Sequence, residues 1–308
     1  MSMKAHPLIT DNLKVGKIAL IYGETGVGKT VTTLQTLKGT ILLITLEHRD
    51  SKVTLGAIAD SGRNPTEISE AAYTNWDDLM EFLGDVTKFK GIDNIVVDGL
   101  TELCSTDLQF EIAMQAFEAR DSGSAKELTN QSKMSQESYG TLGFQLNRMM
   151  GLIGNYAKDG KNIVITSLLS EYPKWNRILS AAPALAGRSF PTALPGKCDF
   201  IGLVERRYSE IADDKGNVVI GDNGEPLKKL SFPPRVKFEP KHGEQFLCKW
   251  TGARDNAKEY MIFPLDWDRI FGISDRAMEV LKDKYLDKKV QGNVEGKVDS
   301  KVVAKKEV

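Results

Sequence analysis

The chain has 308 residues, of which 41% are hydrophobic and 27% are charged, a composition typical of globular proteins with a sizeable core. Its 41 lysines and arginines nearly balance 42 aspartates and glutamates, so the net charge of -1 excludes a global attraction to DNA or to a membrane. Three widely spaced cysteines fit neither a disulfide framework nor a paired-cysteine metal site. No run of about 18 apolar residues indicates a membrane span. We therefore expect a soluble, cytoplasmic protein without a membrane partner.

Buried strands alternate with helices through the first half of the chain. Residues 17–22 (KIALIY) form a continuous apolar run that predicts a strand buried on both faces, and a glycine-rich turn and a helix at 29–38 follow it. Further strands are predicted at 40–46, 92–97 and 162–166. Further helices are predicted at 76–88, capped by Asn75, at 102–120 and at 136–156. This alternation predicts an α/β fold: a mostly parallel sheet with helices on both faces.

The pattern changes after residue 167. Residues 168–196 carry four prolines and no clear period, which predicts a long loop. A strand at 200–208 precedes two turn signals, DDKGN and DNGEP, which predict antiparallel hairpins at the sheet edge. Another strand is predicted at 246–250. We divide the chain into a lead (1–13), a core (14–272) with a hairpin extension at about 207–251, a helix (273–286) and a disordered tail (287–308).

One motif carries chemistry. The segment GETGVGKT fits the phosphate-binding loop pattern G-x-x-x-x-G-K-[ST], and consists of Gly23, Glu24, Thr25, Gly26, Val27, Gly28, Lys29 and Thr30. Backbone N–H groups must converge on phosphate oxygens in such a loop, which requires glycines free of a Cβ. Lys29 is expected to contact the β- and γ-phosphates, and Thr30 to supply an oxygen to Mg²⁺. The alternative is a glycine-rich turn that matches the pattern by chance. A chance match does not explain why a buried strand precedes the segment and a helix follows it.

Two carboxylates are candidates for the rest of a nucleotide site. Asp98 ends the buried strand NIVVD, where a magnesium-binding aspartate is expected, although it could instead cap the following helix. Glu47 ends the strand LLITLE and could orient the attacking water, although it could instead be a surface residue near Arg49. No N-K-x-D guanine motif occurs, so we expect ATP rather than GTP.

These motifs resemble those of phage-encoded RecA-like P-loop ATPases, some of which are single-strand annealing or recombination proteins of the Sak group. The resemblance covers residues 14–263 and rests on GETGVGKT, TLEHRDS, NIVVDGLTEL, SYGTLGFQLNRMM, PALAGRSFPTALPGKCDFIGLVERR and TGARDN. It implies a RecA-like fold, ATP and Mg²⁺ as cofactors, a homo-oligomeric ring or filament, and single-stranded DNA as partner, with a phage single-strand binding protein as a further one. Where family members often carry a histidine or glutamine after the fourth strand, this chain has TSLLS, with Ser167 or Ser170 able to hydrogen-bond phosphate or water.

The loop at 168–197 is where RecA-like proteins contact DNA. It holds cations and interleaved aromatic residues, which suit phosphates and bases, although a subunit contact or a lid is the alternative. The candidate DNA-binding residues are Lys174, Trp175, Arg177 and Arg188. The resemblance further implies a cation supplied by a neighbouring subunit, for which Arg254 is preferred over Arg206 and Arg207. The alternative functions are an assembly or loader ATPase that acts on protein partners, and a small-molecule kinase.

Overall fold

The computed structural model describes residues 16–47, 52–119, 134–174, 176–213, 215–221, 223–251, 262–272 and 275. The predicted lead, the predicted tail and, apart from residue 275, the predicted C-terminal helix lie outside these residues. Within the described part of the chain, no helix combines the length and the apolar character needed to cross a bilayer.

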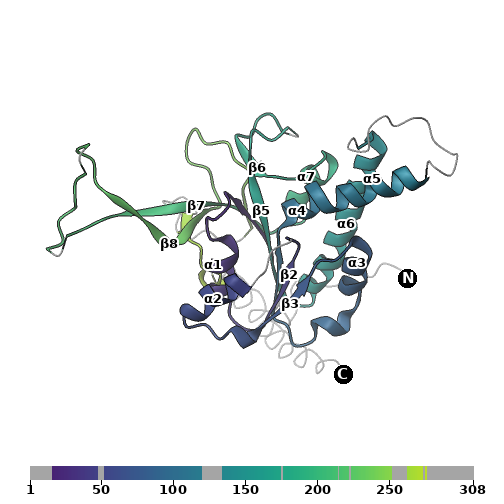
Figure 1. Ribbon diagram of the computed structural model, residues 1–308, viewed down its shortest axis with the longest axis horizontal. Coiled ribbons are helices and arrows are strands. Elements are labelled where there is room, and N and C mark those ends of the chain that lie inside the picture. The colour runs from purple at the N-terminus through teal and green to yellow at the C-terminus, as the bar shows by residue number, and fades with distance from the viewer. Residues whose placement is uncertain are drawn as a thin grey trace, which may run out of the picture.

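The centre of the molecule is a parallel sheet in the order β3–β2–β4–β5–β1–β7 (Figure 1). Its strands are β1 (Ile18–Gly23), β2 (Ile41–Thr45), β3 (Ile68–Ala72), β4 (Asn94–Asp98), β5 (Asn162–Glu171) and β7 (Phe200–Glu210). Strand β1 pairs with β5 on one side and with β7 on the other, so the strand that precedes the glycine-rich loop is central. Strand β5 also separates β1 from β4, which ends in Asp98.

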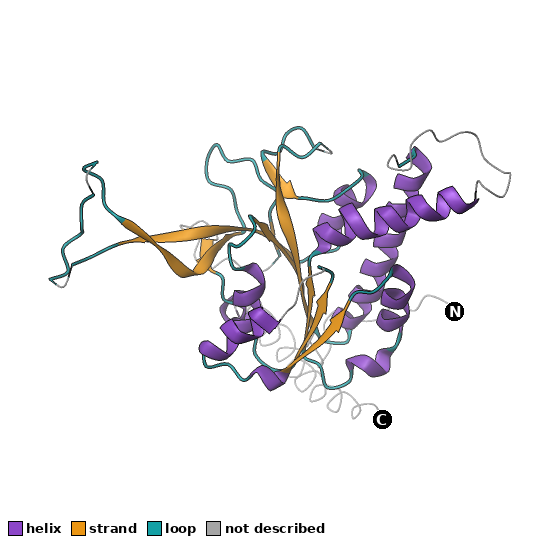
Figure 2. Cartoon of the chain, in the orientation of Figure 1, coloured by secondary structure: helices purple, strands orange, loops and turns teal. Residues whose placement is uncertain are grey.

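Helices cover both faces of this sheet (Figure 2), as the alternation of elements predicts. Alternate side chains of the strands enter two cores: Leu20 and Tyr22 pack with α3, α5 and α6, whereas Ala19 and Ile21 pack with α1 and α2. The helices are α1 (Lys29–Thr36), α2 (Lys52–Asp60), α3 (Trp76–Gly84), α4 (Leu100–Glu102), α5 (Leu108–Ala119), α6 (Gln136–Lys158) and α7 (Ser189–Ala193). A π-helical turn, η3 (Leu103–Asp107), joins α4 to α5, and 3₁₀ turns lie at η1 (Pro65–Glu67), η2 (Val86–Phe89) and η5 (Leu194–Gly196). The predicted cap is present, since Asn75 Oδ1 accepts from the Asp78 backbone N–H.

Antiparallel strands extend the edge beyond β7. They are β8 (Lys228–Lys237), which pairs with β7, β10 (Ile262–Pro264), which pairs with β8, and the short β9 (Lys249–Trp250). Strands β7 and β8 continue outward as a twisted ribbon that projects from the body (Figure 1). We call residues 205–235 the arm. An ion pair of 2.9 Å between Arg235 and Glu205 lies at its root. The predicted hairpin extension is therefore present at the edge.

Two predictions from the sequence are incomplete or wrong. The polar stretch between the second strand and the helix that starts at Trp76 contains α2 and β3, which the sequence pattern does not predict. Strand β3 is half-exposed and pairs on the sheet only with β2 along its length in the described residues, so it lacks the apolar run of a buried strand. Edge strands of this kind carry little hydrophobic signal.

Residues 168–196 are also more ordered than the predicted long loop. Strand β5 runs on through Glu171 and pairs with β6 (Ala181–Pro183), and α7 and η5 follow. Prolines favoured the loop prediction, yet three of the four prolines lie within these elements: Pro183 ends β6, Pro191 lies in the first turn of α7 and Pro195 lies in η5. A proline in a first helical turn gives up an N–H group that has no intrahelical partner.

Candidate nucleotide-binding site

The glycine-rich loop begins where β1 ends between its two neighbouring strands. A Cβ built on Gly23 would lie 2.3 Å from the carbonyl oxygen of Val204, so only glycine fits there. Gly26 and Gly28 have φ angles of 71° and 95°, the left-handed region that favours glycine. Helix α1 starts directly after Gly28, and its first N–H groups face the loop. The loop therefore has the shape that an anion-binding backbone requires.

Lys29 lies inside this loop. Its side chain is 9% exposed, and its ammonium group donates to the carbonyl oxygens of Gly23 at 2.9 Å and Glu24 at 2.8 Å. These contacts hold a positive charge at the mouth of the loop, alongside the N-terminal end of α1.

Thr30 meets Asp98 beneath the loop. The Thr30 hydroxyl donates to Oδ1 of Asp98 at 2.6 Å, and the Thr166 hydroxyl donates to the same oxygen at 2.5 Å. The Thr166 hydroxyl also accepts from the backbone N–H of Gly99 at 3.0 Å. Asp98 is 3% exposed, and these contacts join α1, β4 and β5 at the carboxyl ends of the strands. The sequence predicts Thr30 and Asp98 at this site but gives no indication of Thr166, whose role depends on β5 lying between β1 and β4.

Glu47 lies beside Asp98, as the sequence predicts. The preceding residue, Leu46, donates its backbone N–H to the carbonyl oxygen of Asp98 at 2.8 Å. The Glu47 side chain crosses Gly99, because a Cβ built on Gly99 would lie 2.4 Å from Cγ of Glu47. Gly99 has a φ of 98°, so both its backbone and its lack of a side chain admit this glutamate. The two carboxylates thus lie at the ends of neighbouring strands, next to the phosphate-binding loop.

The donor set beneath the loop suits a hard cation. A carboxylate oxygen of Asp98 and the hydroxyl of Thr30 are already in contact, and both are oxygen ligands. Among the described residues, no group of three or more His, Cys, Asp or Glu side chains could hold a metal by itself. Mg²⁺ commonly binds through one or two protein oxygens together with the phosphates of its substrate, and these residues fit that pattern.

Strand β5 connects this site to a cavity beyond it. Thr101 accepts from the Leu168 backbone N–H at 2.8 Å and shares a hydrogen bond of 2.8 Å with Ser167. Ser167 is therefore held against Thr101, whereas Ser170, three residues on, lines the cavity.

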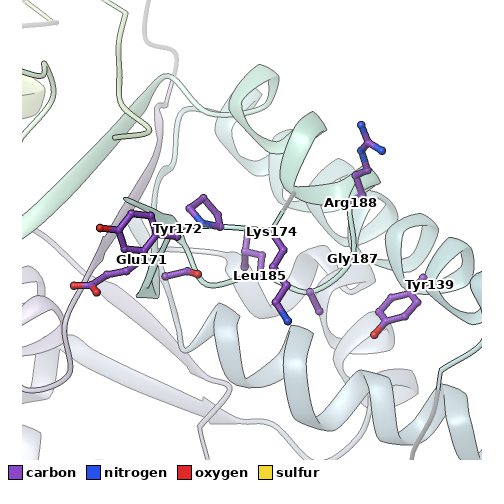
Figure 3. A pocket seen from close by; sticks show the side chains of 10 residues that line it. Tyr139, Glu171, Tyr172, Lys174, Leu185, Gly187 and Arg188 are labelled. Carbon is purple, nitrogen blue, oxygen red and sulfur yellow. The ribbon is translucent and has the colours of Figure 1, made fainter. Parts of the chain in front are cut away.

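The cavity holds about 540 Å³ and lies between the end of β5, the segment before α7 and helix α6. Figure 3 shows Glu171 and Tyr172 at one end, Tyr139 and Arg188 at the other, and Lys174 between them. Tyr172 is 79% exposed. The structure thus brings two predicted DNA-binding residues, Lys174 and Arg188, to one cavity. Arg177 is exposed on the same loop but does not line the cavity.

Trp175 and Arg254, two further predicted residues, lie outside the described residues. Arg206, considered as a cation for a neighbouring subunit, instead lies against its own chain's loop. Its guanidinium donates to the carbonyl oxygen of Thr25 at 3.4 Å and lies 3.7 Å from the Glu24 carboxylate. A cation near the loop is therefore present in the same chain, although it lies 181 residues away in sequence.

The sequence model of a family described as an AAA domain matches residues 16–225, which include the loop, Asp98, Glu47 and the cavity. No curated protein matches the chain.

Proposed function

Because the chain belongs to the AAA domain family, we propose that it binds and hydrolyses ATP and that it contacts single-stranded DNA through the cavity after β5. An AAA-type ATPase domain indicates nucleotide binding and hydrolysis. The identity of the nucleotide, the roles of individual residues and the DNA are the parts that we propose.

The hydrogen bond between Thr30 and Asp98 carries the nucleotide assignment. These residues are 68 positions apart, yet the fold places both directly under a loop with the geometry of a phosphate site. In the proposed complex, the loop N–H groups and Lys29 bind the phosphates. Thr30 and Asp98 hold Mg²⁺, which neutralises charge on the phosphate oxygens when bound.

Glu47 supplies the proposed base. Glu47 lies two residues beyond the end of β2, the strand that pairs with β4, and the backbone hydrogen bond from Leu46 to Asp98 holds this segment beside Asp98. A carboxylate so placed can accept a hydrogen bond from water and orient its oxygen toward the terminal phosphate. Gly99 directly follows Asp98, so the second acidic residue of this site comes from the segment after β2 and does not follow Asp98 on β4.

The cavity after β5 is the proposed DNA contact. Lys174 and Arg188 can meet phosphates, and Tyr139 and Tyr172 offer aromatic surfaces to bases. Because β5 is continuous from Thr166, which touches Asp98, to Glu171, which lines the cavity, one strand links the two sites. The resemblance of the motifs to phage annealing and recombination ATPases favours single-stranded DNA, and recombination, annealing or replication as the process. A loader that acts on protein partners is the second candidate, because the cavity's aromatic and cationic lining also suits a protein interface.

The test measures binding of fluorescent single-stranded DNA to the full chain, with and without ATP and Mg²⁺. We expect the wild type to bind and K174A/R188A to bind more weakly. The slope of the logarithm of the binding constant against the logarithm of the salt concentration should become shallower by about 0.7 for each phosphate contact that is lost. The double variant K88A/K90A removes two exposed lysines at η2 and serves as the matched control. The Lys29→Ala variant should lose ATP binding while it keeps its fold, because the Lys29 side chain contacts the loop and belongs to neither hydrophobic core. If the wild type binds no DNA in any nucleotide state, the protein-partner function is favoured instead.

A further inference from the structure

The root of the arm touches the phosphate-binding loop at two points. Arg206 of β7 contacts Thr25 and Glu24 on the first half of the loop. Phe232 of β8 lies over the second half, because a Cβ built on Gly28 would lie 3.0 Å from Cε1 and 3.7 Å from Cδ1 of its ring. The pairing of β7 with β8 shifts register between Glu205 and Arg207, next to these contacts. Irregularities of this kind in a strand change the direction in which its side chains point.

Phe232 is 63% exposed although it is adjacent to the loop. Single exposed apolar residues are common, so exposure alone has no meaning. The position is what distinguishes this ring: its edge faces Gly28, and most of its surface remains open beside the site. Leu230, two residues away on the same strand, is also exposed but pairs with Tyr208 farther out on the arm.

The strand order gives the direction in which a bound nucleotide must run. Asp98 and Thr166 lie on β4 and β5, on one side of β1, and they mark the side of the metal and the terminal phosphate. Phe232 and Arg206 lie on β8 and β7, on the opposite side of β1. A triphosphate whose last phosphate points toward β4 therefore directs its ribose and base toward β7 and β8.

We propose that Phe232 is the platform on which the base of the bound nucleoside triphosphate stacks. The proposal rests on the nucleotide site described above and names the part of the ligand that this site recognises. Every base has a π-face, so a single aromatic ring binds bases by stacking without reading their hydrogen-bonding edges. The ligand class is thus a nucleoside triphosphate, with purines preferred because their larger rings cover more of the phenyl ring.

The test compares ATP with inorganic tripolyphosphate, which has the phosphates but no base, by calorimetric titration of the full chain with Mg²⁺. We expect Phe232→Ala and Phe232→Leu to weaken ATP binding about tenfold and to leave tripolyphosphate binding unchanged. Phe232→Trp should restore ATP affinity, because it restores an aromatic face. Leu230→Ala is the matched control and should bind both ligands like the wild type.

The outcomes separate this proposal from the nucleotide site itself. Unchanged ATP affinity in Phe232→Ala overturns the platform, as does an equal loss for ATP and tripolyphosphate, which would mean that the ring acts only on the shape of the loop. In both cases the wild type still binds ATP through Lys29, so the proposed function stands. If the wild type binds neither ligand, the nucleotide site and the platform both fail.

Discussion

Gly99 makes room for Glu47: the side chain of the glutamate crosses the position where any other residue at 99 would place its Cβ, 2.4 Å from Cγ of Glu47. The glycine that follows Asp98 is therefore tied to the carboxylate on the neighbouring strand. Gly99→Ala should displace Glu47 and slow ATP hydrolysis, with ATP binding retained. Gly91→Ala is the matched control, because Gly91 also has a positive φ but has open space around its Cβ position. Equal turnover in both variants would contradict a catalytic position for Glu47.

Replacing Glu47 itself tests its chemistry. Glu47→Gln keeps the size of the side chain but removes the charge that polarises water, so we expect ATP hydrolysis to fall by about 10²-fold or more while ATP still binds. Turnover under single-turnover conditions, together with equilibrium binding, measures the two effects separately. Unchanged hydrolysis would place the base elsewhere.

Thr166 donates to the Asp98 carboxylate alongside Thr30 and is 2% exposed. The Thr166 hydroxyl donates to the Asp98 carboxylate and accepts from the Gly99 N–H. Thr166→Val removes this hydroxyl, so the buried carboxylate and the N–H group each lose one hydrogen bond. A cost of about 1–3 kcal/mol in the free energy of unfolding is expected. Urea titration measures it, and Thr166→Ser, which keeps the hydroxyl, should retain most of the stability. A loss as large in the serine variant would assign the effect to packing.

Arg254, which lies outside the described residues, remains the predicted cation from a neighbouring subunit. Such a cation is worth about 10³–10⁵ in rate where it has been isolated. The variants Lys29→Ala and Arg254→Ala should each be inactive, and their mixture should regain activity, because some interfaces then pair an intact loop with an intact arginine. An active Arg254→Ala variant, or a mixture that assembles and stays inactive, would exclude this role.

Acid should weaken the fold through Glu244. Lys237 donates to this carboxylate at 2.8 Å, and that hydrogen bond lowers the pKa of Glu244 below its ordinary value of 4.5. A carboxylate with a lowered folded-state pKa contributes stability above its unfolded pKa and loses it as the pH falls through the folded one. The free energy of unfolding should therefore fall less in Glu244→Gln than in the wild type between about pH 6 and about pH 3. Glu225→Gln, at an exposed position of the arm, should follow the wild type.

The sequence by itself determined the elements whose signals are local. A buried apolar run, a glycine pattern and the start of a helix stand next to one another in residues 17–38, so β1, the loop and α1 could be predicted together. The sequence also placed Asp98 and Glu47 at strand ends, and these meet because the carboxyl ends of parallel strands share one edge. Hairpin turns are equally local, and the arm follows from them.

Tertiary structure alone decided which distant residues complete the site. Thr166 reaches Asp98 across 68 positions only because β5 lies between β1 and β4, and no local pattern encodes that strand order. Arg206 and Phe232 reach the loop because β7 and β8 pair on the other side of β1. Strand β3 could not be predicted from the sequence, because an exposed edge strand does not require an apolar run. Local sequence sets the backbone of each element, whereas the contacts between elements depend on the burial that their packing gains as a whole.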